Sequence, residues 1–373
     1  MVPERIESPD PFALIGRTLA DKYQVEAFVH ETATSVVYRA AHRVWRRPIA
    51  IKVFKSRSFG DRERSQLLES FVREGAVLAS LSELTAGVCQ ARDIASLVTE
   101  QGDCVPYLVL EWLDGEPLDI VLEREREQGS PPRTIERALQ VLEPVARALS
   151  LAHDRGIVHR DVKPGNICLL AGAAVRGTPL TKLYDFGIAM SLRGVAAGGA
   201  GEDPGPCGGG PLRNSYTPCY AAPEQYSPEY GALGPWTDVF ALALVFLELI
   251  TGQEGLSGDT LDELRARACD PLSRPTPRAH RVRVGDDVER VLERALAVHP
   301  TVRYGHAGDF WAALTQAAKD RAREATLPIV LVRKRPTSRR HWMAALLAIG
   351  SGAVTAAALS YWAQVSQVLG YVH

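Results

Sequence analysis

The alternation of apolar and polar positions divides the chain into two parts with different secondary structure. Between about residues 20 and 110, the short β-like runs "SVVYRA", "IAIKVF" and "YLVLEW" surround one helical segment. From about residue 130 to 318 the apolar positions recur mainly at helical spacing. A small mixed part followed by a larger helical part predicts two lobes with a cleft between them.

The helical segment of the first part, "RSQLLESFVREGAVLASL", carries an acid on its apolar face. Four apolar residues share that face: Leu67, Phe71, Leu78 and Leu81. Glu74 falls on the same stripe, and a carboxylate turned inward is costly unless a cation neutralises it. Lys52, at the end of the apolar run "IAIK", is the candidate partner. The alternative is that Glu74 lies at the edge of the stripe and reaches solvent.

A second helix, "TDVFALALVFLELITG" over residues 237–252, is apolar on nearly every side, which predicts that it is buried. Thr237 is the expected N-terminal cap and Gly252 the expected C-terminal cap. Asp238 then lies at the positive end of a buried helix. Asp238 could therefore be a functional residue or only a partner of the helix dipole.

Four polar segments suggest the chemistry: "GIVHRDVKPGNICL", "KLYDFGIAM", "SYTPCYAAPEQY" and "VHPTVRYG". Phosphoryl transfer needs cations on the phosphates, oxygen ligands for Mg²⁺ and a carboxylate that orients the attacking hydroxyl. These segments hold all three kinds of group. Their order and spacing together are more specific than any single triplet.

The whole constellation resembles the protein-kinase fold, specifically the eukaryotic-like serine/threonine kinases of bacteria, from about Tyr23 to Leu314. The resemblance implies an α+β, bilobal fold with a small β-rich N-lobe and a larger, mainly helical C-lobe. The expected divisions are an N-terminal extension (1–19), the N-lobe (20–113) and the C-lobe (114–318). The implied cofactors are ATP and Mg²⁺, and the implied substrates are Ser/Thr hydroxyls of proteins.

The resemblance implies that two lysines contact the phosphates of ATP and that one of them has an ion-pair partner. "IAIK" matches the motif in which Lys52 contacts the α- and β-phosphates, and Glu74 would be its ion-pair partner on the helix. Lys163 stands two residues after Asp161, which is the serine/threonine pattern, and would neutralise charge on the γ-phosphate.

"HRDVKPGN" resembles the catalytic loop and "DFG" the metal-binding motif of the family. By this match Asp161 would accept the proton of the substrate hydroxyl. Asn166 and Asp185 would bind Mg²⁺.

Further positions of the ATP site follow from the same match. "YLVLEWLDG" resembles the hinge, with Leu110 as gatekeeper and the backbone of Glu111 and Leu113 bonding adenine. Side chains expected to sandwich the adenine ring are Val37, Ala50 and Cys168, for which ordinary apolar packing is the alternative. Residues of the phosphate-covering loop are Val29, His30, Thr32 and Ser35.

Four residues would have structural roles in such a kinase. Glu224 of "APE" would pair with Arg303, and Asp238 would hydrogen-bond the backbone of the catalytic loop. Thr217 would contact the Asp161–Lys163 pair near the substrate.

The chain departs from the family at the phosphate loop. Aligned on "VVY", the three glycines of the family fall at His30, Thr32 and Ser35. Side chains there keep the backbone further from the phosphates, so we expect weaker ATP binding rather than lost chemistry, with hydroxyls offering substitute contacts. The alternative is a membrane-tethered pseudokinase or ATP-binding scaffold. A small-molecule kinase of related fold is disfavoured, because "TPCYAAPEQ" resembles the peptide-docking segment of protein kinases.

Composition and termini add the cellular context. The formal net charge of −1 gives no general attraction to nucleic acid. The six cysteines form no CxxC pair, which predicts free thiols in a reducing compartment, and "MVPERIESPDPF" has no apolar core typical of a signal peptide.

Residues 342–362, "WMAALLAIGSGAVTAAALSYW", carry no charge and are long enough to cross a bilayer as a helix. A buried helix of a soluble fold is the alternative. The basic linker 319–341 and the tail 363–373, which lacks Lys and Arg, predict a single-pass protein of the inner or plasma membrane with a cytoplasmic kinase domain. The spacing of Ala348, Gly352 and Ala356 is a weak signal for a homodimer.

Overall fold

The computed structural model describes residues 10–32, 35–55, 61–99, 102–175, 178–186 and 218–326. Residues 1–325 form one unit and residues 326–373 a second, so nearly all described residues belong to the first. Thr217, the predicted membrane span 342–362 and the tail after it lie outside the described residues. Within the described part, no helix is both long and apolar enough to cross a membrane.

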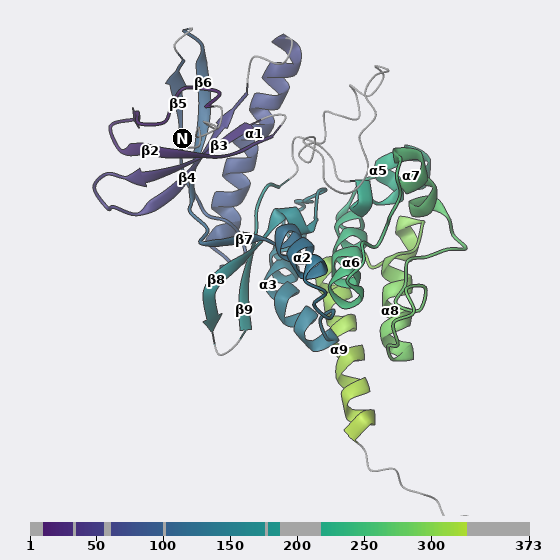
Figure 1. Ribbon diagram of the computed structural model, residues 1–373. Coiled ribbons are helices and arrows are strands. Elements are labelled where there is room, and N and C mark those ends of the chain that lie inside the picture. The colour runs from purple at the N-terminus through teal and green to yellow at the C-terminus, as the bar shows by residue number, and fades with distance from the viewer. Residues whose placement is uncertain are drawn as a thin grey trace, which may run out of the picture. The chain divides into compact units, whose positions relative to one another are not determined.

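An antiparallel sheet forms the N-lobe (Figure 1), with strand order β1-β2-β3-β4-β6-β5. The strands are β1 (Thr18–Leu19), β2 (Tyr23–Glu31), β3 (Ser35–His42), β4 (Pro48–Phe54), β5 (Ala91–Val98) and β6 (Cys104–Glu111). The runs "SVVYRA", "IAIKVF" and "YLVLEW" supply its three central strands, as the alternation predicts. Strands β1, β2 and β5 were not predicted, because exposed polar residues on their outward faces interrupt the pattern of apolar positions.

The N-lobe helix is α1 (Asp61–Ser82), and it packs beside β5. Phe71, Leu78 and Leu81 are buried on the predicted face, while the side chain of Leu67 lies outside the described part. Glu74 is buried with them, so the alternative of a solvent-reaching acid is excluded. Residues that precede β1 also join this lobe: Leu14 is fully buried, and Asp10 accepts a hydrogen bond of 2.7 Å from the Tyr38 hydroxyl.

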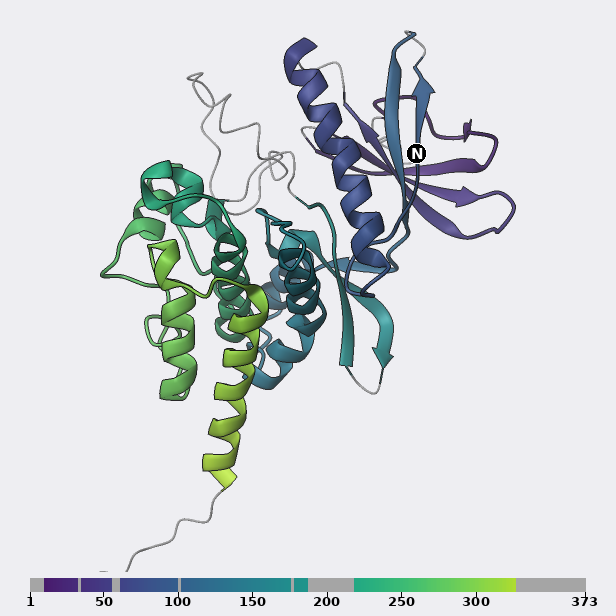
Figure 2. The same ribbon diagram turned by 180° about the vertical axis from the view of Figure 1, so that it is seen from behind.

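Helices build the C-lobe (Figure 2). They are α2 (Leu118–Glu127), α3 (Ile135–His153), α5 (Pro223–Tyr226), α6 (Pro235–Thr251), α7 (Leu261–Cys269), α8 (Asp286–Ala295) and α9 (Ala307–Thr326). Helix α6 is buried on almost all sides, as its uniformly apolar sequence predicts, and α3 and α8 pack against it. The α+β, bilobal fold is therefore the observed one.

The start of α6 differs from the prediction. The helix begins at Pro235 after the cap residue Gly234, not at Thr237. Thr237 instead occupies the third helical position, and its hydroxyl accepts a hydrogen bond of 3.1 Å from the Gly234 N–H. Proline fits the first turn because its missing N–H would have no helical partner there. The C-terminal cap is as expected, with Gly252 in the left-handed region at φ 71°.

A three-stranded sheet, which the helical reading of this region missed, lies beside α2 and α3. It consists of β7 (Gly115–Pro117), β8 (Ile167–Val175) and β9 (Thr178–Leu183). Strand β8 follows the short helix η1 (Pro164–Asn166), and β9 ends two residues before Asp185. This hairpin therefore brings "HRDVKPGN" and "DFG" to the same end of one sheet.

Candidate active site

Two carboxylates from distant parts of the chain meet at Lys52. Its Nζ donates to Glu74 Oε1 at 2.7 Å and also to Asp185 Oδ1. Strand β4 supplies the lysine, helix α1 the glutamate, and the segment after β9 the aspartate. Lys52 and Glu74 are only 7% and 8% exposed, so each would be unstable there without its partner.

The surroundings of Lys52, Glu74 and Asp185 shift the pKa values of all three groups. Burial opposes the charge on Lys52, but the carboxylates of Asp185 and Glu74 outweigh it and raise the pKa of the ammonium above its usual value. Burial raises the pKa of Glu74 despite the opposing charge of Lys52. Burial also acts on Asp185, yet Lys52 holds the pKa of that carboxyl below its usual range. The lysine and Asp185 therefore remain charged at neutral pH.

The loop between α3 and η1, together with η1, brings a second set of polar side chains together. Asp161 Oδ2 lies 2.9 Å from Lys163 Nζ. Asn166 Nδ2 donates to the same carboxylate oxygen at 3.0 Å and to the Asp161 carbonyl at 2.8 Å. The carboxylate of Asp161 is thus held by one cation and one amide, while its side chain stays 23% exposed.

The segment around Asp185 joins the two groups. The Tyr184 N–H donates to the Asn166 carbonyl at 3.1 Å. The ring of buried Phe186 packs on the ring of His159 with centroids 4.5 Å apart, and His159 Nε2 lies 3.2 Å from the Tyr184 carbonyl. These contacts fix the position of Asp185 relative to the loop that carries Asp161.

Asp238 supports this loop from the buried helix α6. Its carboxylate accepts from the His159 N–H at 2.8 Å and from the Arg160 N–H at 2.7 Å, and lies 2.9 Å from His153 Nε2. The expected bonds to the loop backbone are therefore present. Arg160 adopts φ 67°, a strained value for a side-chain-bearing residue, and the two bonds compensate for that strain.

Glu224 and Arg303 form a fully buried, bidentate ion pair. The two terminal guanidinium nitrogens, Nη1 and Nη2, each lie 2.8 Å from a carboxylate oxygen of Glu224. Thr237 donates to Glu224 at 2.8 Å, and Arg303 also donates to the carbonyls of Ala297 and Val298 at 2.7 Å each. Every polar atom of the pair is therefore satisfied, which is what a buried ion pair requires.

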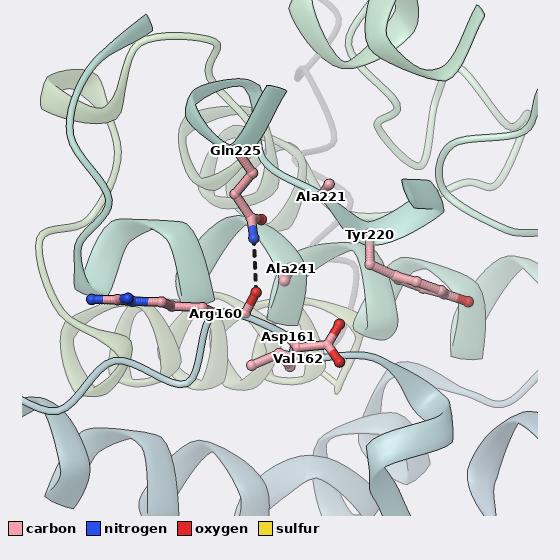
Figure 3. A pocket seen from close by; sticks show the side chains of 7 residues that line it. All are labelled: Arg160, Asp161, Val162, Tyr220, Ala221, Gln225 and Ala241. Carbon is pink, nitrogen blue, oxygen red and sulfur yellow. Dashed lines mark hydrogen bonds between the residues drawn. The ribbon is translucent and has the colours of Figure 1, made fainter. Parts of the chain in front are cut away.

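Residues 218–226 lie against the loop that carries Asp161 (Figure 3). Gln225 Nε2 donates to the Arg160 carbonyl at 2.7 Å, and Asp161 lies beside this bond. Tyr220, Ala221 and Gln225 help to line a cavity of about 10 Å³, room for one water at most. The segment before α5 thus borders the carboxylate that could act as a base.

A model of the protein kinase domain matches residues 23–316. The chain belongs to this family. Serine/threonine-protein kinase PknA of Mycobacterium tuberculosis is 30% identical over 300 residues, covering 79% of this chain and 61% of the relative. PknL of the same organism is 31% identical over 333 residues, covering 88% and 72%. The chain thus spans about three fifths of PknA. The crystal structure of the M. tuberculosis PknI kinase domain superimposes with a TM-score of 0.56 at 25% identity, over 81% of this chain and 98% of that one.

The residues expected at the adenine site lie on neighbouring strands. Ala50 on β4 pairs with Leu110 on β6, and Val37 on β3 pairs with Lys52. Leu110 and Cys168 are buried, Val37, Ala50, Glu111 and Leu113 are partly buried, and Val29 and His30 are exposed. The sheet register therefore brings the central candidates together around Lys52.

The loop hydroxyls contact each other. Thr32 Oγ1 lies 3.0 Å from Ser35 Oγ and accepts from the Ser35 N–H at 3.0 Å, while the Thr32 N–H donates to the Ser35 carbonyl at 2.8 Å. Ser35 is buried, and Lys55 Nζ adds a bond of 3.2 Å to the Thr32 carbonyl. The expected hydroxyl contacts to phosphate therefore compete with these bonds between Thr32 and Ser35.

Several positioning contacts were not predicted. Lys182 forms an ion pair with Glu111 and so ties β9 to the end of β6, and the Tyr184 hydroxyl donates to the Gly165 carbonyl at 2.5 Å. The contacts of Gln225 with the Arg160 carbonyl and of His153 with Asp238, described above, were not predicted either. Sequence gives a signal only for Lys182, the one charged residue of β9, whereas the other contacts depend on tertiary structure.

Cysteine chemistry differs in part from the prediction. Cys89, Cys104, Cys168 and Cys269 are free thiols. Cys219, which is buried, is disulfide-bonded, so the expectation of free thiols is wrong at that position. Spacing along the chain could not reveal this, because pairing depends on the three-dimensional approach of two sulfurs.

Proposed function

We propose that this chain is a serine/threonine protein kinase that transfers the γ-phosphate of ATP to hydroxyls of protein substrates. The observation that carries the proposal is the contact of Lys52 with both Glu74 and Asp185. Family membership and the similarity to PknA and PknL support it. The neighbours of Asp185, Tyr184 and Phe186, contact the loop that carries Asp161.

The donor set fits a divalent metal of the Mg²⁺ type. The amide nitrogen of Asn166 is used by Asp161, which leaves the amide oxygen as a ligand, and Asp185 supplies carboxylate oxygen. Oxygen ligands of this kind suit Mg²⁺. When bound, ATP with its metal supplies the phosphoryl group and neutralises charge on the phosphates.

The protein groups then act by position and charge. Lys52, held by Glu74, would orient the α- and β-phosphates, and Lys163 would neutralise charge on the phosphoryl group being transferred. Asp161 would orient the substrate hydroxyl and accept its proton. Gln225 and Asp238 would keep the loop in place through backbone bonds.

The test is phosphate transfer from radiolabelled ATP with Mg²⁺ to a generic protein substrate and to the chain itself, followed by phosphoamino acid analysis. We expect phosphoserine and phosphothreonine. Label confined to phosphotyrosine, or no label above a reaction lacking the protein, would contradict the proposal.

The alternative of an ATP-binding scaffold is favoured by one feature, the phosphate loop without glycines. We expect the triple substitution His30→Gly, Thr32→Gly and Ser35→Gly to lower KM for ATP several-fold, because the backbone can then approach the phosphates. Steady-state kinetics at varied ATP would measure this. Ala20→Gly, in an exposed turn with φ 46°, is the matched control and should leave KM unchanged.

An unchanged or higher KM in the triple variant would have a different meaning. It would show that the hydroxyl-rich loop is adapted to ATP rather than degenerate. The kinase proposal would survive that result, because it depends on Lys52 and Asp161.

We further propose that residues 342–362 anchor the protein in the inner or plasma membrane with the kinase domain in the cytoplasm. The support is the uncharged 21-residue run and its basic N-terminal flank. Retention in the membrane pellet after alkaline carbonate washing is expected. Release into the supernatant would contradict the anchor.

A further inference from the structure

The hairpin between β3 and β4 carries an exposed cluster of arginines and apolar side chains. We name residues 43–47 the hairpin tip; its sequence is Arg43, Val44, Trp45, Arg46 and Arg47. Val44 is 77% exposed and Trp45 64% exposed, and the three arginines are exposed as well. The hairpin projects from the sheet on the side away from α1 (Figure 1).

The conformation of the tip is held in place. His42 Nδ1 accepts from the Val44 N–H at 3.3 Å and from the Trp45 N–H at 3.2 Å. The His42 ring stacks on Trp45 with centroids 4.3 Å apart, and it also meets the ring of buried Tyr23 edge-on, with centroids 5.5 Å apart. Trp45 is therefore braced from beneath while most of its surface faces solvent, so the exposure is not a consequence of a loose loop.

The charge of the tip is unbalanced. No acidic residue stands between Glu31 and Asp61. The other described cations of this stretch have acidic partners: Arg39 with Glu26, Lys52 with Glu74, and Lys55 with Glu31. The three tip arginines form no ion pair with any residue that the structure describes. The adjacent turn adds Asp21 and Lys22, whose charges cancel.

We propose that the hairpin tip docks on an anionic lipid surface, with Trp45 and Val44 at the headgroup boundary and the arginines on lipid phosphates. Tryptophan favours the membrane interface, and arginine pairs with phosphate through two parallel hydrogen bonds. Each cation near an anionic leaflet strengthens partition about fivefold, so three give about 100-fold. An acidic protein surface could pair with the arginines, but it would offer no apolar environment to the projecting side chains of Val44 and Trp45.

A second copy of the chain fits less well. Pairing of two tips would bring three arginines against three like charges, which is repulsive. The sequence gives a second argument for a membrane. Only residues 327–341 separate the end of α9 from the proposed span, and a fully extended chain of this length covers at most about 50 Å. That second argument rests on the proposed anchor, whereas the chemistry of the tip does not.

The test is hydrogen exchange of the full chain, measured by mass spectrometry, with vesicles of phosphatidylcholine alone and of phosphatidylcholine mixed with phosphatidylglycerol. We expect several-fold slower exchange at residues 43–47 in the anionic vesicles, whether or not the anchor inserts. The triple variant Arg43→Gln, Arg46→Gln and Arg47→Gln should lose that difference, and Trp45→Ala should reduce it. Arg92→Gln, an exposed arginine on β5 of the same lobe, is the control and should retain it.

Equal exchange at the tip in the two kinds of vesicle would overturn the proposal. Protection that rises with protein concentration in the absence of lipid would also overturn it, because the occupant would then be a second copy. Phosphate transfer by the triple variant in detergent should equal that of the wild type, so loss of lipid docking and failure of the kinase proposal give different results.

Discussion

Replacing Asp161 by asparagine is expected to lower kcat for phosphate transfer by about 10²- to 10⁴-fold, the usual worth of a positioned general base. Asparagine keeps the size of the side chain but loses its charge and its ability to accept a proton. Affinity for ATP should change little, since Asp161 contacts Lys163 and Asn166 rather than the Lys52 cluster. Single-turnover transfer and equilibrium ATP binding, measured on the same preparation, separate the two effects.

Asp154→Asn is the matched control for this experiment. Asp154 follows α3, close to the same loop, and its exposed side chain pairs with His306 at 3.2 Å. Its substitution should leave transfer unchanged. If Asp161→Asn retained the wild-type rate, Asp161 would not be the base and the proposed mechanism would be wrong.

Removing Arg303 is expected to produce the largest loss of stability. Arg303→Leu leaves the carboxylate of Glu224 buried without its cation and deprives three backbone carbonyls of a donor, including that of Trp236. Breaking a buried ion pair in this way costs about 3–5 kcal/mol of unfolding free energy. In a domain of this size that corresponds to a fall in Tm of roughly 6–10 °C, which calorimetry or a thermal shift assay would detect.

The chain offers an exposed pair of the same geometry as a control. Arg124 and Glu116 also form two parallel bonds, of 2.7 Å each, but on the surface, where water already solvates both charges. Arg124→Leu should therefore barely change Tm. Equal losses in the two variants would mean that burial is not what makes the Glu224–Arg303 pair important.

The fold could be predicted from the sequence wherever one face of an element is buried. The spacing of Phe71, Leu78 and Leu81 indicated α1, and the position of Glu74 on that stripe indicated a buried cation partner, which the structure contains in Lys52. Helix α6 was predicted from its uniformly apolar sequence. Its N-terminal cap was placed three residues late, at Thr237 instead of Gly234, because a glycine cap followed by a proline in the first turn was not considered.

Features that depend on tertiary pairing could not be predicted. Strands β8 and β9 sit within a region of mainly helical periodicity, and their pairing is set by contacts with β7 and α3. The bonds of Gln225 and Tyr184 to backbone carbonyls, and the mutual bonding of Thr32 and Ser35, have no local sequence signature. The motifs predicted which residues lie close together, whereas only the structure gives the contacts that hold them.

The central claim is that Lys52, Glu74, Asp185, Asn166 and Asp161 form one nucleotide–metal site that transfers phosphate. Its most direct test is autophosphorylation of the full chain and of Lys52→Met with ATP, with and without Mg²⁺, with ATP binding measured in parallel. We predict metal-dependent transfer by the wild type, and its loss in Lys52→Met together with weaker ATP binding. A wild type that binds ATP but transfers no more phosphate than Lys52→Met would contradict the claim and identify the chain as an ATP-binding scaffold.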